Sequence, residues 1–503
     1  MSNTVNPISV DYIMRQVNGL VAHSTDLSIE VHGITIDSRK IKDGYLFTAV
    51  QGDAVDGRKF IEDAIDRGAV VLLTDHQTAQ SYSKKICCIS HDEPRRAYAH
   101  IVRCLFPLQP EKMVAVTGTN GKTSVVHFYA QLLARGGFNT ASIGTMGFFD
   151  GHGHSIGELT HMTTPMAEEL HQRLSLLVTD YHITRAAIEA SSHGLDQYRL
   201  HGITVHAAAF TNLTRDHLDY HKTLDAYFTA KLKLFSELVI PNGTAVLNQD
   251  DEHYAAIKQV CDQRGIRIWA FGKKGETCRI TNIQHEGYVQ CVTITYEGTR
   301  YILRLPLIGE FQVSNVLCAI GLILATEPSL SMEQLIPMAE TLTGVPGRMQ
   351  LLPTQQGVPS VVVDYSHTPD GLEKALEELR VVTKGKVWVV FGCGGNRDSG
   401  KRPQMGKIAA ELADHIIITD DNPRHENPAD IRQMILSACP NAREIADRAD
   451  AIAYAVKNAH GDDMILIAGK GHETTQTIKD RVMPFNDAQV AVHAIEKYYD
   501  KHN

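Results

Sequence analysis

Short, continuous apolar runs recur along the last third of the chain. They cover 360–364, 386–391, 416–420 and 464–468, and each ends in polar residues or glycine. Strands buried on both faces have this composition, because helices cover a parallel sheet from both sides. The pattern predicts an α/β domain with a parallel sheet over about 345–503.

The beginning of the chain shows a different pattern. Apolar and polar residues alternate over 33–39 and again over 44–52, which is typical of strands with one buried face. A helical spacing follows over 60–69, and 69–74 is a short apolar run. These elements predict a separate, small α/β domain over 1–107.

Two prolines within 106–110 interrupt a helical pattern and predict a linker. From 108 to 344, apolar strand patterns alternate with helical stretches, as in a doubly wound sheet. We expect the polar, His- and Gly-rich stretch 150–161 inside this region to be a mobile loop. The chain has 503 residues, a length that suits about three domains.

The stretch Val114-Ala-Val-Thr-Gly-Thr-Asn-Gly-Lys-Thr-Ser124 joins an apolar strand to a helical pattern through glycines. Such a turn cradles phosphate: backbone N–H groups face the oxygens, Lys122 neutralises charge, and Thr123 offers a hydroxyl to Mg²⁺. Val116 stands where the full P-loop pattern has glycine, so an ordinary strand-to-helix turn is the alternative. The cradle predicts ATP use and leaves the acceptor open.

Two strand patterns in the middle region end in candidate metal ligands. Glu189 closes 185–189, and His217 lies in the polar cluster after 207–210. Ligands of open α/β sheets bind at the carboxyl ends of strands, so both side chains could face the phosphates as Mg²⁺ ligands. The alternative for each is a solvated or internally satisfied side chain.

The glycine loop Gly392-Cys-Gly-Gly395 lacks the spacing of a dinucleotide fingerprint. Arg397, Lys401 and Arg402 follow it closely, which favours a positively charged loop for an anionic ligand.

Composition narrows the class of protein. A net charge of -9 argues against a nucleic-acid partner, and no apolar run approaches the ~20 residues that span a bilayer. Nine dispersed cysteines fit reduced thiols, and the first residues lack a signal-peptide pattern. We expect a cytoplasmic enzyme.

Several motifs together resemble the Mur ligases. They are 117–123, Glu189-Ala-Ser-Ser-His193, Asn212-Leu-Thr-Arg-Asp-His-Leu-Asp219, Gly347-Arg348 and Asp364-Tyr-Ser-His-Thr-Pro369, and they keep the family order. Asp37-Ser-Arg39 and Asp421-Asn-Pro-Arg424 narrow the resemblance to the branch that adds meso-diaminopimelate to UDP-N-acetylmuramoyl-L-alanyl-D-glutamate. Met162 and Gln312 depart from residues common in relatives; these departures concern one loop contact and one adenine contact.

The resemblance implies three domains, with a P-loop ATPase-type doubly wound sheet in the centre and a Rossmann-like C-terminal domain. It implies an acyl phosphate made with ATP and Mg²⁺, followed by amine attack, in peptidoglycan precursor synthesis. Lys122, Glu189 and His217 would act at the phosphates. Lys231 matches a lysine carbamylated by CO₂, whose negative charge would support Mg²⁺ beside Thr123; a surface helix lysine is the alternative.

The same resemblance assigns three groups of binding residues. The ATP group is Gly118, Thr119, Asn120, Gly121, Lys122, Thr123, Ser124, Asn315, Arg348 and Asp364. The UDP-sugar peptide group is Ile36, Ser38, Asp53, Ala54, Val55, Thr163, Thr164, Ser191, Gln197 and Arg199. The diaminopimelate group is Arg397, Asp421, Asn422, Pro423, Arg424, Gly469 and Glu473. Arg348 would lie on a hinge whose closure completes the site, and we expect a monomer.

Three alternatives stay open at this point. A folylpolyglutamate synthetase shares the cradle but has no use for Asp37-Ser-Arg39. A lysine-adding relative differs only in its amino acid. A non-catalytic module that binds ATP to change shape would leave Lys231, Arg397 and Glu473 without a role.

Overall fold

The computed structural model describes residues 6–52, 55–157, 162–214, 216–353 and 357–499. The chain forms two compact units. One runs as far as Thr277 and includes Leu317–Met332; the other comprises Cys278–Val316 and the chain from Glu333 onward. Each unit is described separately below. The predicted mixed α/β architecture is confirmed, whereas the domain boundaries at 107/108 and 344/345 stay predictions.

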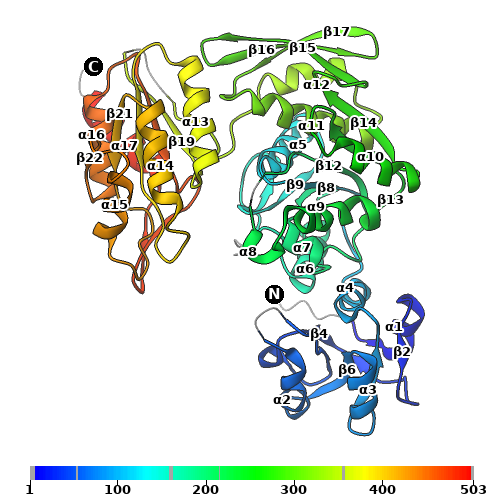
Figure 1. Cartoon of the computed structure of the whole chain (residues 1–503). Helices are drawn as coiled ribbons and strands as arrows, with labels where there is room; N and C mark the ends of the chain where they lie inside the picture. The colour runs from blue at the N-terminus through cyan, green and yellow to red at the C-terminus, as the bar shows by residue number, and fades with distance from the viewer. Residues whose placement is uncertain (1–5, 53–54, 158–161, 215, 354–356, 500–503) are drawn as a thin grey trace. The chain divides into compact units, whose positions relative to one another are not determined.

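The first part of the chain folds around a five-stranded sheet in the order β2-β7-β6-β5-β4 (Figure 1). The strands β4 to β7 are parallel, and β2 runs antiparallel to β7. Its elements are β1 (Ile8–Ser9), α1 (Val10–Gln16), β2 (Val21–Ala22), β3 (Glu30–Val31), β4 (Gly33–Thr35), β5 (Tyr45–Thr48), α2 (Ile61–Asp66), β6 (Ala69–Thr74), α3 (His76–Tyr82), β7 (Cys87–Ser90) and α4 (Pro94–Leu105).

The strand predicted over 33–39 is shorter than the alternation suggests. The Asp37 carboxylate accepts a 3.1 Å hydrogen bond from the backbone N–H of Arg39, and a 3-10 turn, Ser38–Lys40, follows at once. Aspartate favours such local turns over a continuing strand because its side chain competes for backbone donors. The predicted helix over 60–69 is likewise confined to Ile61–Asp66.

The central sheet of the first unit has the order β10-β9-β11-β8-β12-β13-β14. All its pairings are parallel except that of β10 with β9. Its elements are β8 (Lys112–Thr117), α5 (Lys122–Arg135), β9 (Thr140–Gly144), β10 (Gly147–Asp150), α6 (Ala167–Thr179), β11 (Arg185–Glu189), α7 (Ser192–Asp196), β12 (Val205–Phe210), α8 (Leu218–His221), α9 (Leu224–Lys233), the π-helical turn Leu234–Leu238, β13 (Val239–Asn248), α10 (Tyr254–Gln263) and β14 (Arg267–Gly272).

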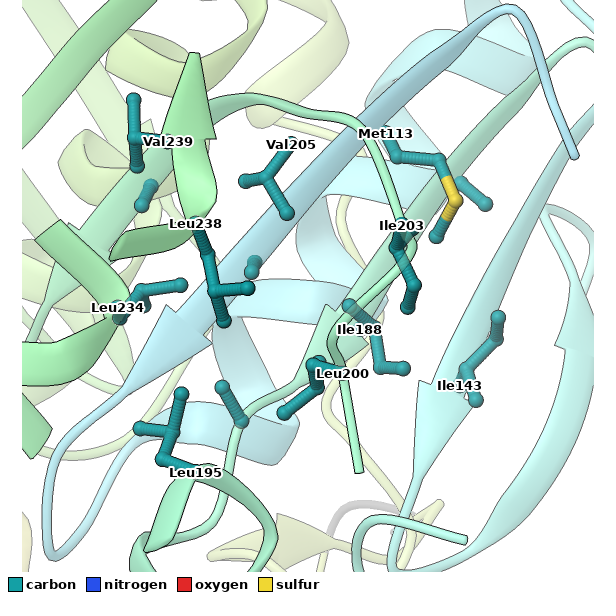
Figure 2. Packing of buried hydrophobic residues seen from close by; sticks show 14 of the residues in the cluster. Met113, Ile143, Ile188, Leu195, Leu200, Ile203, Val205, Leu234, Leu238 and Val239 are labelled. Atoms are coloured by element: carbon teal, nitrogen blue, oxygen red, sulfur yellow. The ribbon is translucent and has the colours of Figure 1, made fainter. Parts of the chain in front are cut away.

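The core of this sheet explains the strand order. Met113, Ile143, Ile188 and Val205 belong to different strands, and Figure 2 shows them beside Leu195, Leu234 and Leu238 of the covering elements, all in one buried cluster. Alternate residues of the strands therefore bury apolar surface under helices. The order places β8 between β11 and β12, so the turn after β8 adjoins the ends of both neighbours.

The second unit contains a parallel sheet in the order β18-β19-β23-β20-β21-β22, with only β18 antiparallel. It also holds an antiparallel meander, β15 to β17, that the sequence analysis missed. The elements of this part of the chain are β15 (Cys278–Glu286), β16 (Val289–Tyr296), β17 (Thr299–Leu305), α11 (Phe311–Thr326), α12 (Met332–Ala339), β18 (Gln350–Leu351), β19 (Ser360–Asp364), α13 (Pro369–Val382), β20 (Val387–Phe391), α14 (Lys401–Leu412), β21 (His415–Ile418), α15 (Pro428–Leu436), β22 (Arg443–Glu444), α16 (Arg448–Asn458), β23 (Met464–Ala468), β24 (Thr475–Ile478), β25 (Arg481–Pro484) and α17 (Asp487–Tyr499).

Helices cover both faces of this parallel sheet (Figure 1). Val362 packs with residues of α13, α14 and α15 in one cluster, while its neighbours Val361 and Val363 pack with α16 and α17 in another. The continuous apolar run over 360–364 is thereby explained. Since β23 lies between β19 and β20, the loops that follow these three strands meet at one edge.

Candidate functional site: a phosphate cradle and a polar loop cluster

The turn after β8 has the geometry of a phosphate cradle. Gly118 and Gly121 adopt positive φ values of 146° and 84°, and a Cβ at Gly118 would lie 1.9 Å from Oγ1 of Thr211. Gly121 caps α5, whose first intrahelical bond runs from Val125 N–H to the Gly121 carbonyl. The N–H groups of Lys122, Thr123 and Ser124 therefore stand at the helix start with its partial positive charge.

The loop after β12 holds the cradle in place. Asn212 accepts from the N–H of Asn120 on its side-chain oxygen and from the N–H of Thr119 on its carbonyl, at 3.0 and 2.9 Å. Thr214 N–H donates to Oγ1 of Thr119 at 2.9 Å. Thr119 therefore binds the loop after β12, and the first residues of the motif Asn212–Asp219 support the cradle.

Two lysines converge on the cradle. Nζ of Lys122 donates to the carbonyls of Gly118 and Thr119 at 2.9 and 2.8 Å. Nζ of Lys231, on α9, donates to the same Gly118 carbonyl at 2.7 Å and lies 4.3 Å from the ring centre of Tyr227. Lys231 is 1% exposed. The alternative of a surface lysine is excluded.

Burial lowers the pKa of Lys231 well below its usual value, and the charge of Lys122 lowers it further. The neutral amine of Lys231 is therefore more accessible than that of an exposed lysine. Only a neutral amine has the lone pair that attacks CO₂, so the environment suits carbamate formation. Carbamylation itself stays a prediction.

Glu189 ends β11 beside the cradle and is almost completely buried. Its carboxylate accepts hydrogen bonds from the backbone N–H and Oγ1 of Thr145, at 2.9 and 3.2 Å. Thr145 Oγ1 also contacts Oγ1 of Thr163 at 3.0 Å. The strand end and the loop after β9 thus fix the orientation of the carboxylate.

The predicted sugar–peptide residues of the first unit form one connected group. Oγ1 of Thr164 donates to the Glu189 carbonyl at 2.8 Å and lies 2.9 Å from Oγ of Ser191. Arg199 donates to the Thr164 carbonyl at 2.8 Å and to Oε1 of Gln197 at 2.7 Å. Arg199 also contacts the sulfur of Met162 at 3.2 Å, so this departure from relatives still supports the group.

Aromatic rings gather around His217. His217 has a positive φ of 52° and lies 4.9 Å from the ring of His193 and 6.0 Å from that of Tyr227, centre to centre. The ring centre of His193 also lies 4.2 Å from that of Tyr220, with the two rings tilted by 42°. Since Oη of Tyr227 contacts Oγ1 of Thr119 at 3.2 Å, this aromatic group reaches the cradle.

The residues near the N-terminus that were predicted to bind the uridine differ in their exposure to solvent. Ser38 is buried and Ile36 is half-buried, next to the Asp37 turn. Val55 is 55% exposed. Asp53 and Ala54 lie outside the described residues. A role of these residues toward a uridine stays a prediction.

In the second unit, Asp364 ends β19, and its carboxylate binds two nearby backbone N–H groups. Its carboxylate accepts from the N–H of Met349 at 2.7 Å and from the N–H of Ser366 at 2.9 Å. The guanidinium of Arg348 lies 4.6 Å from the ring centre of Tyr365. Nδ2 of Asn315 donates to Oε1 of Gln312 at 2.9 Å, both residues being buried. Contacts of Asn315, Arg348 and Asp364 with a nucleotide stay a prediction.

The predicted diaminopimelate residues lie on the loops that follow β20, β21 and β23, at the carboxyl edge of the second unit's sheet. Arg424, with a φ of 50°, donates through Nη1 to the Gly395 carbonyl at 2.9 Å. Nδ2 of Asn422 donates to Oε2 of Glu473 at 2.8 Å. A Cβ at Gly469 would lie 2.7 Å from Oδ2 of Asp421. Pro423 is buried between them, whereas Arg397 is exposed after the glycine loop.

The donors beside the cradle fit a magnesium ion that arrives with a nucleotide. Across the described ranges, no three His, Cys, Asp or Glu side chains gather into a metal-binding group. Mg²⁺ in phosphate sites needs few protein ligands, because waters and phosphate oxygens complete its shell. The buried Thr123 hydroxyl and the Glu189 carboxylate are hard oxygen donors of the required kind.

A glycine cradle at a helix start, on a doubly wound parallel sheet, defines the class of protein as a P-loop-type phosphate-binding α/β protein. Three family profiles match the chain: "Mur ligase family, catalytic domain" over residues 30–113, "Mur ligase middle domain" over 116–323 and "Mur ligase, glutamate ligase domain" over 347–471.

Relatives match over nearly their full length. The chain is 44% identical to the UDP-N-acetylmuramoyl-L-alanyl-D-glutamate--2,6-diaminopimelate ligases of Bradyrhizobium diazoefficiens and Zymomonas mobilis, covering 93% and 92% of this chain and 95% of each relative. A solved structure with the same enzyme name is 30% identical with a TM-score of 0.70, covering 99% of this chain and 100% of its own. The chain therefore belongs to the Mur ligase family.

Several residues of these sites escaped the sequence analysis. Thr145, which holds Glu189, and Tyr227, which lies against Lys231, belong to no motif that we recognised. Thr145 follows a buried strand end, and that position was the available signal. Lys470 also went unnoticed, although it adjoins the predicted Gly469.

Proposed function

We propose that the chain is an ATP-dependent ligase that joins meso-2,6-diaminopimelate to UDP-N-acetylmuramoyl-L-alanyl-D-glutamate. The observation that carries the proposal is the buried Lys231 beside Lys122 at the cradle, in a chain whose 44% identical relatives carry this enzyme's name. The product would serve peptidoglycan synthesis, and with it cell shape and division.

The chemistry follows from charge and position. A γ-carboxylate oxygen of the D-glutamate end attacks the γ-phosphorus of ATP, and ADP leaves. The amine of diaminopimelate then attacks the acyl carbon, loses a proton, and phosphate leaves with the former carboxylate oxygen. Lys122 and the N–H groups at the start of α5 neutralise the phosphates, while Arg199, Gln197 and Thr164 orient the peptide.

Mg²⁺, when bound, neutralises charge on the phosphates and the acceptor carboxylate. Thr123, Glu189, His217 and a carbamylated Lys231 would hold it. Asn315, Arg348 and Asp364 of the second unit would bind the nucleotide.

Within the described residues, no helix combines the length and apolar character that crossing a bilayer requires. All nine cysteines are free, and several are deeply buried thiols. These thiols support the proposal that the enzyme works in the reducing cytoplasm. We expect it to act as a monomer.

The decisive experiment measures phosphate release and product mass from ATP, the UDP-sugar dipeptide and an amino acid. We expect turnover only when all three are present, and a product whose mass equals dipeptide plus diaminopimelate less water. Equal use of L-lysine would favour a lysine-adding enzyme. Turnover with a folate acceptor would favour a folylpolyglutamate synthetase. ATP binding without turnover would overturn the ligase proposal.

A further inference from the structure

Lys470 is a completely buried lysine at the carboxyl end of β23. Its side chain is 0% exposed, and it follows Gly469, whose φ is 115°. Nζ donates to the Thr475 carbonyl at 2.7 Å, to Oε2 of Glu473 at 3.0 Å and to Oδ1 of Asn422 at 3.1 Å. All three ammonium hydrogens therefore have an acceptor, which a buried charge requires.

Two of these acceptors belong to the predicted diaminopimelate group. Asn422 is fixed from both ends of its amide: Oδ1 accepts from Lys470 and from the N–H of Thr477 at 2.9 Å, while Nδ2 donates to Oε2 of Glu473 at 2.8 Å. Glu473 is one-third exposed, so its carboxylate still reaches solvent on one side. The orientation of both side chains thus depends on one ammonium group.

We propose that Lys470 is a positioning residue that, together with Asn422, sets Glu473 for binding the distal ammonium of diaminopimelate. This inference rests on the proposed function. Lys470 contacts its neighbours from inside the fold, and the hydrogen bonds from Lys470 and Asn422 to Oε2 hold the Glu473 carboxylate in place. A bound ammonium therefore meets an anchored carboxylate. Without Lys470, Asn422 and Glu473 lose a charged hydrogen bond each, and Glu473 is free to swing toward solvent.

The test compares the Lys470→Met variant of the full chain with the parent enzyme. Met keeps the length of the side chain and removes the ammonium. We expect KM for meso-diaminopimelate to rise about tenfold to a hundredfold, the range for lost charge-assisted hydrogen bonds, while kcat and the KM values for ATP and the UDP-sugar dipeptide change less than about twofold. A purely structural lysine would instead alter all of these parameters together or none.

Two companion measurements sharpen the result. Lys407→Met, an exposed lysine on α14 of the same unit, serves as the matched control and should leave every KM unchanged. In a double-mutant cycle, Glu473→Gln and Lys470→Met should combine to much less than the product of their separate effects on KM. Fully multiplicative effects, or an unchanged KM for diaminopimelate in folded Lys470→Met, would overturn the inference.

If Lys470→Met does not fold, two measurements decide. Reductive methylation of the folded parent should modify Lys407 and spare Lys470, and Glu473→Gln should lower Tm because it leaves the buried ammonium without its counter-charge. Methylation of Lys470 at the rate of Lys407, or an unchanged Tm, would refute the anchored pair. A parent enzyme that ignores diaminopimelate would instead refute the proposed function, which separates the two failures.

Discussion

Nζ of Lys231 donates a 2.7 Å hydrogen bond to the carbonyl of Gly118, a residue 113 positions earlier in the chain. A lysine of α9 thereby becomes part of the phosphate cradle that begins after β8. Lys122 donates to the same carbonyl, so two amines share one oxygen. Burial lowers the pKa of Lys231 well below its usual value, and the close approach of this second cation lowers it further.

Replacing Lys122 should abolish ligation without unfolding the protein. Removing a preorganised positive donor at transferring phosphates costs about 3–4 kcal/mol in the transition state, so kcat of Lys122→Ala should fall at least about a hundredfold. Phosphate release measures this effect. Lys258→Ala, a surface lysine paired with Asp262, is the control and should retain full activity. Near-parental turnover by a folded Lys122→Ala variant would disprove the role of the cradle.

Activity should depend on CO₂ through Lys231. Because burial lowers the pKa of Lys231, its neutral amine is more accessible than that of an exposed lysine and can form a carbamate. Dissolved CO₂ should therefore raise the activity of degassed enzyme. Lys231→Ala should be inactive and partly rescued by acetate, whose carboxylate can replace that of the carbamate. Lys233→Ala, whose parent lysine pairs with Asp196, should show neither effect. Full activity of Lys231→Ala would contradict this account.

Thr145 should matter through Glu189. Thr145→Val keeps the backbone N–H bond to the carboxylate and removes the hydroxyl contacts to Glu189 and Thr163. We expect the Mg²⁺ concentration for half-maximal activity to rise severalfold, in line with the 10–100-fold effects of lost supporting contacts at metal sites. Thr145→Ser should restore the parental Mg²⁺ dependence. A Mg²⁺ titration unchanged in Thr145→Val would show that the hydroxyl does not orient Glu189.

Arg424 should discriminate diaminopimelate from L-lysine. The two amino acids differ by one carboxylate, which an arginine can bind with two parallel hydrogen bonds. In the parent we expect lysine to be rejected by ~10⁴-fold in kcat/KM, as in sites built around a polar group, and Arg424→Ala to lose roughly a hundredfold of that preference. Arg443→Ala, on the surface of the same unit, should keep it. If Arg424→Ala keeps the parental preference for diaminopimelate over L-lysine, Arg424 does not determine this specificity.

Buried histidines should destabilise the fold in mild acid. Burial lowers the pKa of His171 and of His100 to about 4, from a usual 6.5. As the pH falls, the unfolded chain therefore takes up protons at a higher pH than the folded chain does. The stability of the fold from keeping these histidines neutral is complete above pH 6.5 and is lost as the pH falls toward 4. Between pH 7.5 and 5 the fully buried His171 should cost about 2 kcal/mol of unfolding free energy, and the half-buried His100 should cost less because solvent screens it.

Urea unfolding of His171→Gln tests this expectation, because glutamine can still donate to the His201 carbonyl that His171 contacts at 3.0 Å. The variant should lose about 2 kcal/mol less than the parent over that pH range. His152→Gln, at an exposed position, should follow the parent. Identical pH profiles for the parent and His171→Gln would show that His171 is not held neutral.

Much of the fold could be predicted from the sequence. The predicted strands 185–189, 360–364 and 464–468 coincide with β11, β19 and β23. These strands are buried on both faces, so their apolar runs have sharp ends. The meander β15–β17 was missed because its strands carry many exposed polar residues and lack that continuous signal. The turn at Asp37 was hidden because a side-chain hydrogen bond overrides the apolar–polar alternation.

The sequence by itself determined the cradle, its lysine and the candidates at strand ends, because backbone chemistry ties glycine and helix-start motifs to phosphate. Only the tertiary structure decided what supports them. Thr145 meets Glu189 because β9 and β11 are neighbours, and Lys231 meets Gly118 because the chain brings α9 beside the turn after β8. Lys470 reaches Asn422 across the carboxyl edge of another sheet. Such contacts depend on strand order and helix placement, which periodicity along the chain does not encode.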